Sequence, residues 1–229
     1  MIFKSRNENV IYVLIAVFIV LLIFTTVILS SNDIYEAYVD DIILGKNWYE
    51  DVNGRYSDNR YLGLEKQISF IYRYEDSEYP SFLTVNTFKT LFMMNEDDLI
   101  DKTIETIQDA IKGKNMNIDE DSFIQGERVL KNGHKTIFVI YNGTKILDNQ
   151  ADKVHIIGET WSCRESGTSI VVIGFAQTTN TSNGKTDENL EHWAKIVKDQ
   201  ANTFGFSYYN ISDYIFIGEE GLIFNVKCH

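Results

Sequence analysis

Asp152 and His155, with Asp148 nearby, could form a carboxylate and imidazole pair. A carboxylate beside an imidazole serves general acid–base chemistry, because the carboxylate orients the ring and stabilises its charged form. The three residues fall where a polar loop enters an expected strand, and a solvated strand edge is the favoured explanation for them. We therefore keep them as a weak alternative site, for a ligand-sensing or hydrolytic function.

Two cysteines, Cys163 and Cys228, form the second candidate site. They are too few for a disulfide scaffold or a cysteine metal cluster. In an oxidising compartment they would form a disulfide if their Cα atoms came within about 7 Å; two separate thiols are the alternative. The four histidines are scattered, and the sequence contains no nucleophile elbow, phosphate-binding glycine loop or zinc-protease motif. We expect no catalytic residue, no cofactor and no metal site.

Three asparagines lie in N-x-S/T sequons and are candidate glycosylation sites, namely Asn142, Asn180 and Asn210. These asparagines can be glycosylated only if the part of the chain that carries them lies outside the cytoplasm. That question depends on the first element of the chain.

The first element is an apolar run without a charged residue between Glu8 and Asp33. Its length matches a bilayer core and predicts a transmembrane helix over residues 10–30, with a cleavable signal peptide as the alternative. Basic residues precede the run and acidic residues follow it, which places the N-terminus in the cytoplasm. We therefore expect a single-pass protein of the cell membrane that contacts lipid through residues 10–30.

The expected organisation has five parts: a cytoplasmic N-terminus at 1–9, the anchor at 10–30, a membrane-proximal stalk at 31–47, an extracytoplasmic domain at 48–206, and a C-terminal tail at 207–229 with an added hairpin. The net charge of −12 argues against nucleic acid as a partner, because the two would repel each other. Cationic ligands remain allowed.

Residue patterns within the outer part predict alternating strands and helices. Strands are expected at 67–74, 81–91, 123–130, 135–141, 154–164 and 169–178, and helices at 96–112 and 187–203. The clearest local signals are the Asn132-Gly133 turn, which favours a hairpin, and Asn95, which caps the first helix. The order predicts an α+β fold, an antiparallel sheet with helices packed on it.

This order and spacing of elements resembles the PsbP-like fold, named for a photosystem II subunit and shared with a Ran-binding nuclear import factor. The similar features run from Lys46 to Phe206: Trp48-Tyr49 ahead of the first strands, the helix Glu96 to Lys112, the Gly133-centred hairpin, the strand Thr168 to Thr178, and the closing helix with Trp193. The resemblance implies a PsbP-like sandwich and a non-catalytic role in assembly or partner binding. The expected function is therefore to bind or stabilise a protein partner outside or within the membrane.

Overall fold

The structure is a computed structural model that describes residues 3–30, 34–45, 47–60, 65–75, 78–112, 114–147, 150–204 and 220–229; within the first range the side chains are described at 11–24. Its helices are α1 (Phe3–Ser30), α2 (Asp41–Leu44), α3 (Glu96–Ile111) and α4 (Glu191–Val197), with 3-10 turns η1 (Val52–Gly54), η3 (Thr181–Asn183) and η4 (Ile223–Asn225). Its strands are β1 (Trp48–Glu50), β2 (Tyr56–Arg60), β3 (Glu65–Tyr74), β4 (Ser81–Thr90), β5 (Met116–Val129), β6 (Lys135–Leu147), β7 (Gln150–Cys163) and β8 (Thr168–Gln177).

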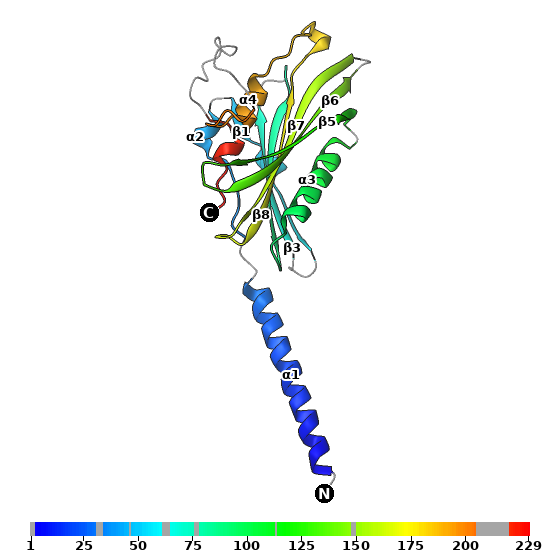
Figure 1. Ribbon diagram of the computed structural model, residues 1–229, viewed down its shortest axis with the longest axis vertical. Helices are drawn as coiled ribbons and strands as arrows, with labels where there is room; N and C mark the ends of the chain where they lie inside the picture. Colours follow the sequence, from blue (N-terminus) through cyan, green and yellow to red (C-terminus); the bar gives the residue numbers. More distant parts are fainter. Residues whose placement is uncertain are drawn as a thin grey trace.

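The strands form one eight-stranded sheet in the order β1-β3-β4-β8-β7-β6-β5, with β2 also paired to β3 (Figure 1). Every pairing is antiparallel. The hairpin predicted at Asn132-Gly133 joins β5 to β6, and Gly133 has the positive φ of +84° that favours glycine in such a turn. Strand β5 changes register between Asp119 and Ile124, a β-bulge that bends it along the sheet edge.

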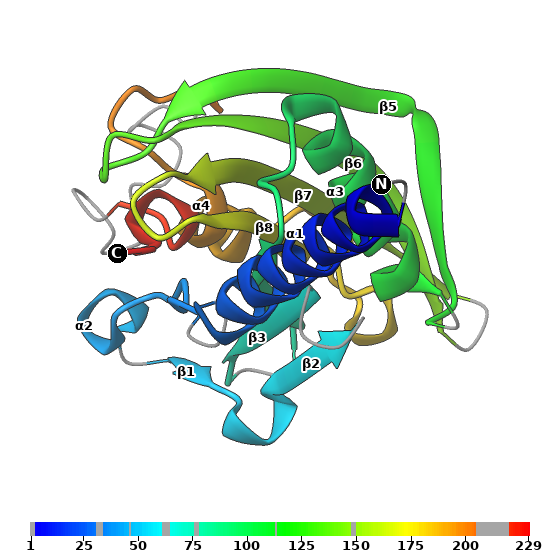
Figure 2. The same ribbon diagram turned by 90° about the horizontal axis from the view of Figure 1, so that it is seen from below.

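Different helices cover the two faces of the sheet: α3 lies on one side and α4 on the other (Figure 2). Helix α3 packs its Leu99 and Ile107 on one face, against Val154, Ile156 and Ile173. Because both faces are covered at the centre, every residue of β8 is buried. A second, larger cluster on the opposite face joins the α4 residues to the tail around η4 and to the segment before β1; its members include Ala37, Val39, Trp161, Trp193, Ile196, Leu222, Ile223 and Phe224.

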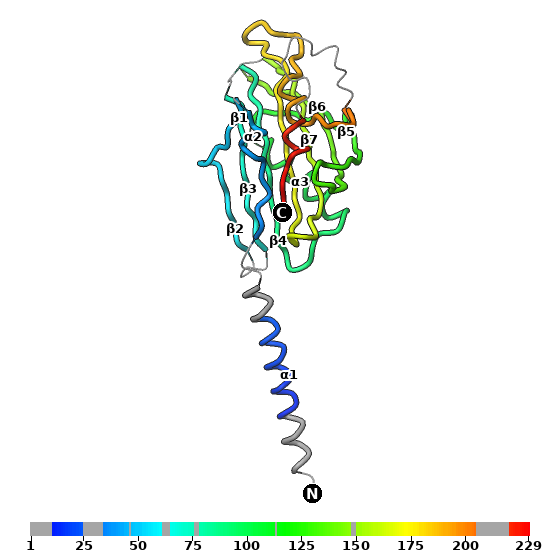
Figure 3. Tube along the Cα trace, turned by 90° about the vertical axis from the view of Figure 1, so that its left-hand side faces the viewer, coloured from blue at the N-terminus to red at the C-terminus, as the bar shows by residue number. Residues whose placement is uncertain are grey.

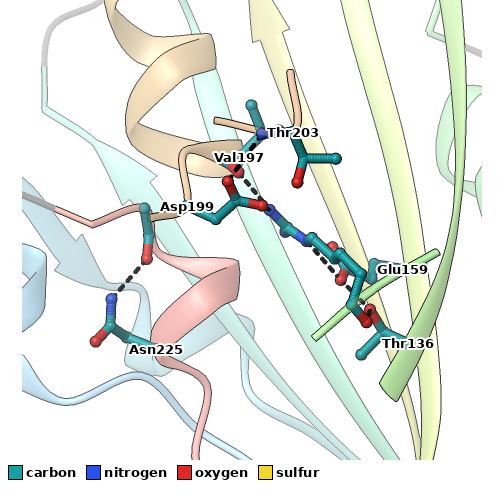
Figure 4. Close-up of polar contacts among 8 residues, drawn as sticks. Thr136, Glu159, Val197, Asp199, Thr203 and Asn225 are labelled. Atoms are coloured by element: carbon teal, nitrogen blue, oxygen red, sulfur yellow. Dashed lines mark hydrogen bonds and ion pairs between the residues drawn. The ribbon is translucent and has the colours of Figure 1, made fainter. Parts of the chain in front are cut away.

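A buried ion cluster crosses this second face beside α4 (Figure 4). Arg128 donates to both carboxylate oxygens of Glu159, at 2.8 and 2.5 Å, and also to Asp199 at 3.2 Å. Thr136 donates to Glu159 at 2.5 Å, and the backbone oxygen of Val197 accepts from Arg128 at 2.5 Å. The cluster ties β5, β6 and β7 to the end of α4.

The segment before β1 and the tail after residue 219 lie side by side (Figure 3). Tyr38 and Lys227 form an isolated antiparallel bridge with two backbone hydrogen bonds of 2.9 Å. Ala37 N–H also donates to Thr87, and Val39 N–H to the hydroxyl of Tyr72. The segment is therefore fixed to both the sheet and the tail.

The transmembrane anchor predicted for residues 10–30 is contradicted. Across the described residues, no helix is long and apolar enough to cross a bilayer. The predicted single-pass topology and cell-membrane location, which depended on the anchor, are corrected with it.

The predicted α+β class, a PsbP-like sandwich behind an anchor, is also wrong. The described chain is mostly an eight-stranded antiparallel sheet with few helices. The closing helix expected at 187–203 forms only at Glu191–Val197. It ends there because backbone N–H groups of the tail bind the carbonyl oxygens that a longer helix would use: Leu222 N–H donates to Lys195 O and Gly221 N–H to Lys198 O, both at 2.8 Å. Strand β5 is longer than expected, because its polar first half pairs with the backbone of β6 and Ser122 Oγ also accepts from Asn142 N–H at 2.8 Å.

Candidate functional site

The acid–base grouping expected at Asp148, Asp152 and His155 is not assembled among the described residues. Asp148 lies outside them. Asp152 is buried and accepts from the side chain of Gln177 at 3.0 Å and from Thr181 N–H at 2.7 Å, so it anchors the loop after β8. Since Asp152 and His155 are three positions apart on β7, their side chains leave opposite faces of the sheet.

His155 is instead held by Asn142 on β6 and by Glu188 in the loop before α4. Its Nδ1 lies 2.7 Å from Asn142 Oδ1, and its Nε2 lies 3.6 Å from a Glu188 oxygen. The ring also packs on Trp193, with 5.3 Å between centroids. Because an amide oxygen only accepts, His155 Nδ1 is the donor, which leaves Nε2 as an acceptor. Nε2 is buried and has no hydrogen-bond partner in the part of the chain that the structure describes.

His155, Asn142 and Glu188 line a cavity of about 340 Å³, here called the His155 cleft. Its lining residues come from β5, β6, β7 and the loop before α4: Asn117, Ile118, Asp119, Asn142, Gly143, Thr144, Lys153, Val154, His155 and Glu188. Gly143 allows β5 to pass close by, since a Cβ there would lie 2.5 Å from the backbone oxygen of Asn117. The cleft therefore depends on glycine at this position.

Charges in the cleft are partly balanced. Lys153 Nζ lies 2.5 Å from Glu188, and the hydrogen bond from Lys153 lowers the pKa of Glu188. Burial lowers the pKa of His155, against the opposing effect of the Glu188 charge. Burial therefore favours the neutral form of His155. Asp119 and Glu188 against Lys153 leave one net negative charge on the lining.

The two cysteines meet two histidines at the opposite end of β7. Cys163 ends that strand, His134 follows the β5–β6 turn, and Cys228 and His229 lie in the tail. Both cysteines are buried free thiols, so the predicted disulfide remains a prediction. Cys163 Sγ lies 3.3 Å from His229 Nδ1, and Cys228 Sγ lies 3.2 Å from His134 Nε2 and 3.5 Å from His229 Nδ1. We call these four residues the Cys–His cluster.

The Cys–His cluster is held in place by the hairpin and the tail together. Asn132 donates its side-chain amide to Val226 O at 3.0 Å, and Lys131 N–H donates to Phe224 O at 3.2 Å. Sequence reasoning missed His134 and His229 as partners of the cysteines, because their separation along the chain matches no metal motif. The Asn132-Gly133 turn was the available signal, since it fixes where His134 emerges.

Electrostatic effects within the cluster differ between the thiols. Burial has the largest effect on Cys163 and raises its pKa, but hydrogen bonds from Cys228, Ser166 and His229 together lower it below the usual value. Burial raises the pKa of Cys228 to about 12. Burial lowers the pKa of His134, whereas the hydrogen bond with Cys163 raises that of His229.

The sequons stay predictions, and the structure gives the surroundings of two of them. Asn142 lies in the His155 cleft. Asn180 is buried, and its side-chain amide donates to Glu78 O at 2.7 Å. Asn210 lies outside the described residues.

Comparison with known proteins adds little. No family model and no curated protein matches the chain. A solved structure of a mutant of the protein Mog1 is similar at 10% sequence identity, over 57% of this chain and 81% of that chain, with a TM-score of 0.29. A likeness this distant carries no argument about fold or function.

Proposed function

We propose that this protein is a non-enzymatic binding domain that takes a small ligand bearing an amine in the His155 cleft. One observation carries the proposal: the neutral imidazole of His155 presents a buried acceptor nitrogen, without a partner in the described chain, 3.6 Å from the carboxylate of Glu188. Two acceptors that face one gap are satisfied by a group with at least two N–H donors.

The charge of the surroundings favours a cation in that gap. An ammonium group would donate to His155 Nε2 and to Glu188 at once, and hydrogen bonds to a carboxylate are stronger than neutral ones. The chain carries a net charge of −12, which attracts cations toward the surface. Asp119, on the other wall of the cleft, offers a second carboxylate to a ligand with two amines.

Binding is favoured over catalysis by the way in which the imidazole is held. Thr144 is the one hydroxyl-bearing residue among those that line the cleft, and in the described chain no hydrogen bond joins it to His155. His155 Nε2 faces a carboxylate rather than a nucleophile that it would activate. A partner-binding role expected from sequence belongs to the same non-enzymatic class.

The test compares three small molecules of the same length by NMR: putrescine, 1,4-butanediol and succinate. Putrescine should shift the imidazole resonances of His155 in a saturable way, while the diol binds more weakly and succinate leaves them unmoved. Glu188→Gln should weaken putrescine binding by about tenfold or more, since it removes a charge-assisted hydrogen bond worth roughly 1.5–3 kcal/mol.

Glu127→Gln is the matched control, because Glu127 forms an exposed pair with Lys135 at the other end of β5, 2.7 Å apart. It should leave the affinity unchanged. Equal weakening in both variants would mean diffuse attraction to the acidic surface and would overturn the proposal. So would a response to succinate as large as that to putrescine.

A further inference from the structure

The Cys–His cluster brings together four metal-ligating side chains from three parts of the chain. One ligand atom from each of His134, Cys163, Cys228 and His229 lies within 4.8 Å of every other. We propose that this cluster is a closed, structural binding site for one zinc ion, independent of the His155 cleft.

The distances suit a tetrahedral ion. Zn²⁺ binds thiolate sulfur at about 2.3 Å and imidazole nitrogen at about 2.0–2.1 Å, so a sulfur and a nitrogen on one tetrahedron lie about 3.6 Å apart. The sulfur–nitrogen separations in the cluster are 3.3 Å for Cys163 and His229, 3.2 Å for Cys228 and His134, and 3.5 Å for Cys228 and His229. Small outward movements of the side chains are enough to admit the ion.

The donor set selects the class of metal. Two thiolates and two imidazoles in a tetrahedral arrangement are typical of zinc, whereas calcium and magnesium prefer oxygen ligands. Two thiolates also neutralise the double charge of the ion. The complex therefore has no net charge, which suits the buried positions of Cys163 and Cys228.

Residues around the cluster are placed as the outer partners of a zinc site usually are. His229 turns Nδ1 toward the sulfurs, while its Nε2 lies 3.2 Å from the carboxylate of Glu165. A carboxylate on the far nitrogen of a ligating histidine fixes the ring and raises its basicity. Hydrogen bonds from Ser166 contribute to lowering the pKa of the Cys163 thiol.

Four protein ligands leave no open position for water, so the ion would act on the fold rather than on a substrate. It would join the β5–β6 turn, the end of β7 and the tail. The tail contributes Leu222 and Ile223, both fully buried, to the core that α4 shares. Zinc would therefore stabilise the whole second face of the sheet.

The experiment titrates the reduced full chain with Co²⁺, and then with Zn²⁺ as competitor. We expect one Co²⁺ per chain, with the intense visible bands of a tetrahedral ion and a thiolate-to-cobalt charge-transfer band, all removed by stoichiometric Zn²⁺. Cys163→Ser and Cys228→Ser should each lower the intensity of the charge-transfer band, because one of the two thiolate ligands is lost. Glu165→Gln should keep the spectrum but weaken metal affinity about 10- to 100-fold.

Asp121→Asn is the control for adventitious binding, because Asp121 is an exposed acid on β5 away from the cluster. It should leave the titration unchanged. A weak octahedral spectrum without charge transfer, or undiminished Co²⁺ binding in both serine variants, would overturn the proposal.

A second measurement on the unaltered chain avoids the risk that a variant misfolds. Stoichiometric Zn²⁺ should block reaction of both thiols with a maleimide, and a chelator should restore it. Thiols that react at the same rate with and without zinc would contradict the site. The site would also be contradicted if the reduced chain, refolded in excess zinc, formed a Cys163–Cys228 disulfide.

Discussion

Arg128 and Glu159 form a two-pronged ion pair in the interior of the protein, with side-chain exposures of 3% and 0%. Such a pair is costly to bury, but removing one partner costs more, because the other charge is then left without compensation. The position of each partner follows from the strands: Arg128 comes from β5 and Glu159 from β7, two strands away.

Arg128→Met should lower the free energy of unfolding by about 3–5 kcal/mol, since it leaves Glu159 and Asp199 buried without their cation. Urea denaturation followed by circular dichroism measures this. The control Lys135→Met breaks an exposed pair with Glu127 and should cost about 1 kcal/mol or less. The double change Arg128→Met with Glu159→Leu should recover part of the loss, because only Asp199 is then left without its cation; a double variant no more stable than Arg128→Met would mean that the uncompensated charge of Glu159 is not the cause.

His155 should make stability fall as the pH drops below about 6.5. Because burial lowers the pKa of His155 in the folded protein, the unfolded chain takes up the proton first, and stability is lost until the pH passes the folded pKa. The charged groups that face the ring are Glu188 and Lys153, which oppose each other.

Between about pH 5 and 8, the free energy of unfolding should therefore depend less on pH in His155→Gln than in the wild type. The difference between the two proteins separates the effect of His155 from that of the other histidines. An NMR titration of the His155 ring gives the folded pKa directly. A value above that of an unstructured histidine would reverse the sign and contradict the prediction.

Gly158→Ala should destabilise the packing of α3 on the sheet by about 1–3 kcal/mol. A Cβ at this position would lie 2.3 Å from Cγ2 of Thr103 and 3.0 Å from Ile107. Thr103→Ser removes that methyl group and keeps the hydroxyl that donates to Leu99 O, so the double variant should regain most of the loss. Thermal unfolding of the three variants checks this, and no rescue would mean that Ile107 causes the clash.

Asn95→Ala should cost about 0.5–2 kcal/mol, because the Asn95 side chain caps α3 by accepting from Asp98 N–H at 2.9 Å. Asn95→Ser keeps a capping oxygen and should cost only a few tenths. Chemical denaturation compares the two. Equal losses would show that the cap hydrogen bond is not what matters at this position.

Local signals in the sequence predicted the parts of the fold that depend on neighbouring residues. The hairpin of β3 and β4, the turn at Asn132-Gly133 and the cap at Asn95 all appear, because each is determined within a few residues. The short strand β2 and the first half of β5 were missed, since both are polar and pair through their backbones. The anchor was predicted from the composition of one segment and is contradicted.

Both candidate sites depend on contacts that no local pattern carries. His155 was picked out by its residue type, but its partners Asn142 and Glu188 come from another strand and a loop. The Cys–His cluster needs the end of β7, a turn and the tail together. These residues come together through the pairing of strands, which the sequence predicted only for strands that follow each other in a hairpin.

The bridge between Tyr38 and Lys227 sets the order in which the protein can be completed. All eight strands of the sheet lie between these residues along the chain, so a ribosome must release them before the bridge closes. Until then the buried positions at Ala37 and Val39 lack the tail beside them. The part of this apolar face that the tail covers therefore stays open until residue 227 has been made, and chaperone binding would be of most use before then.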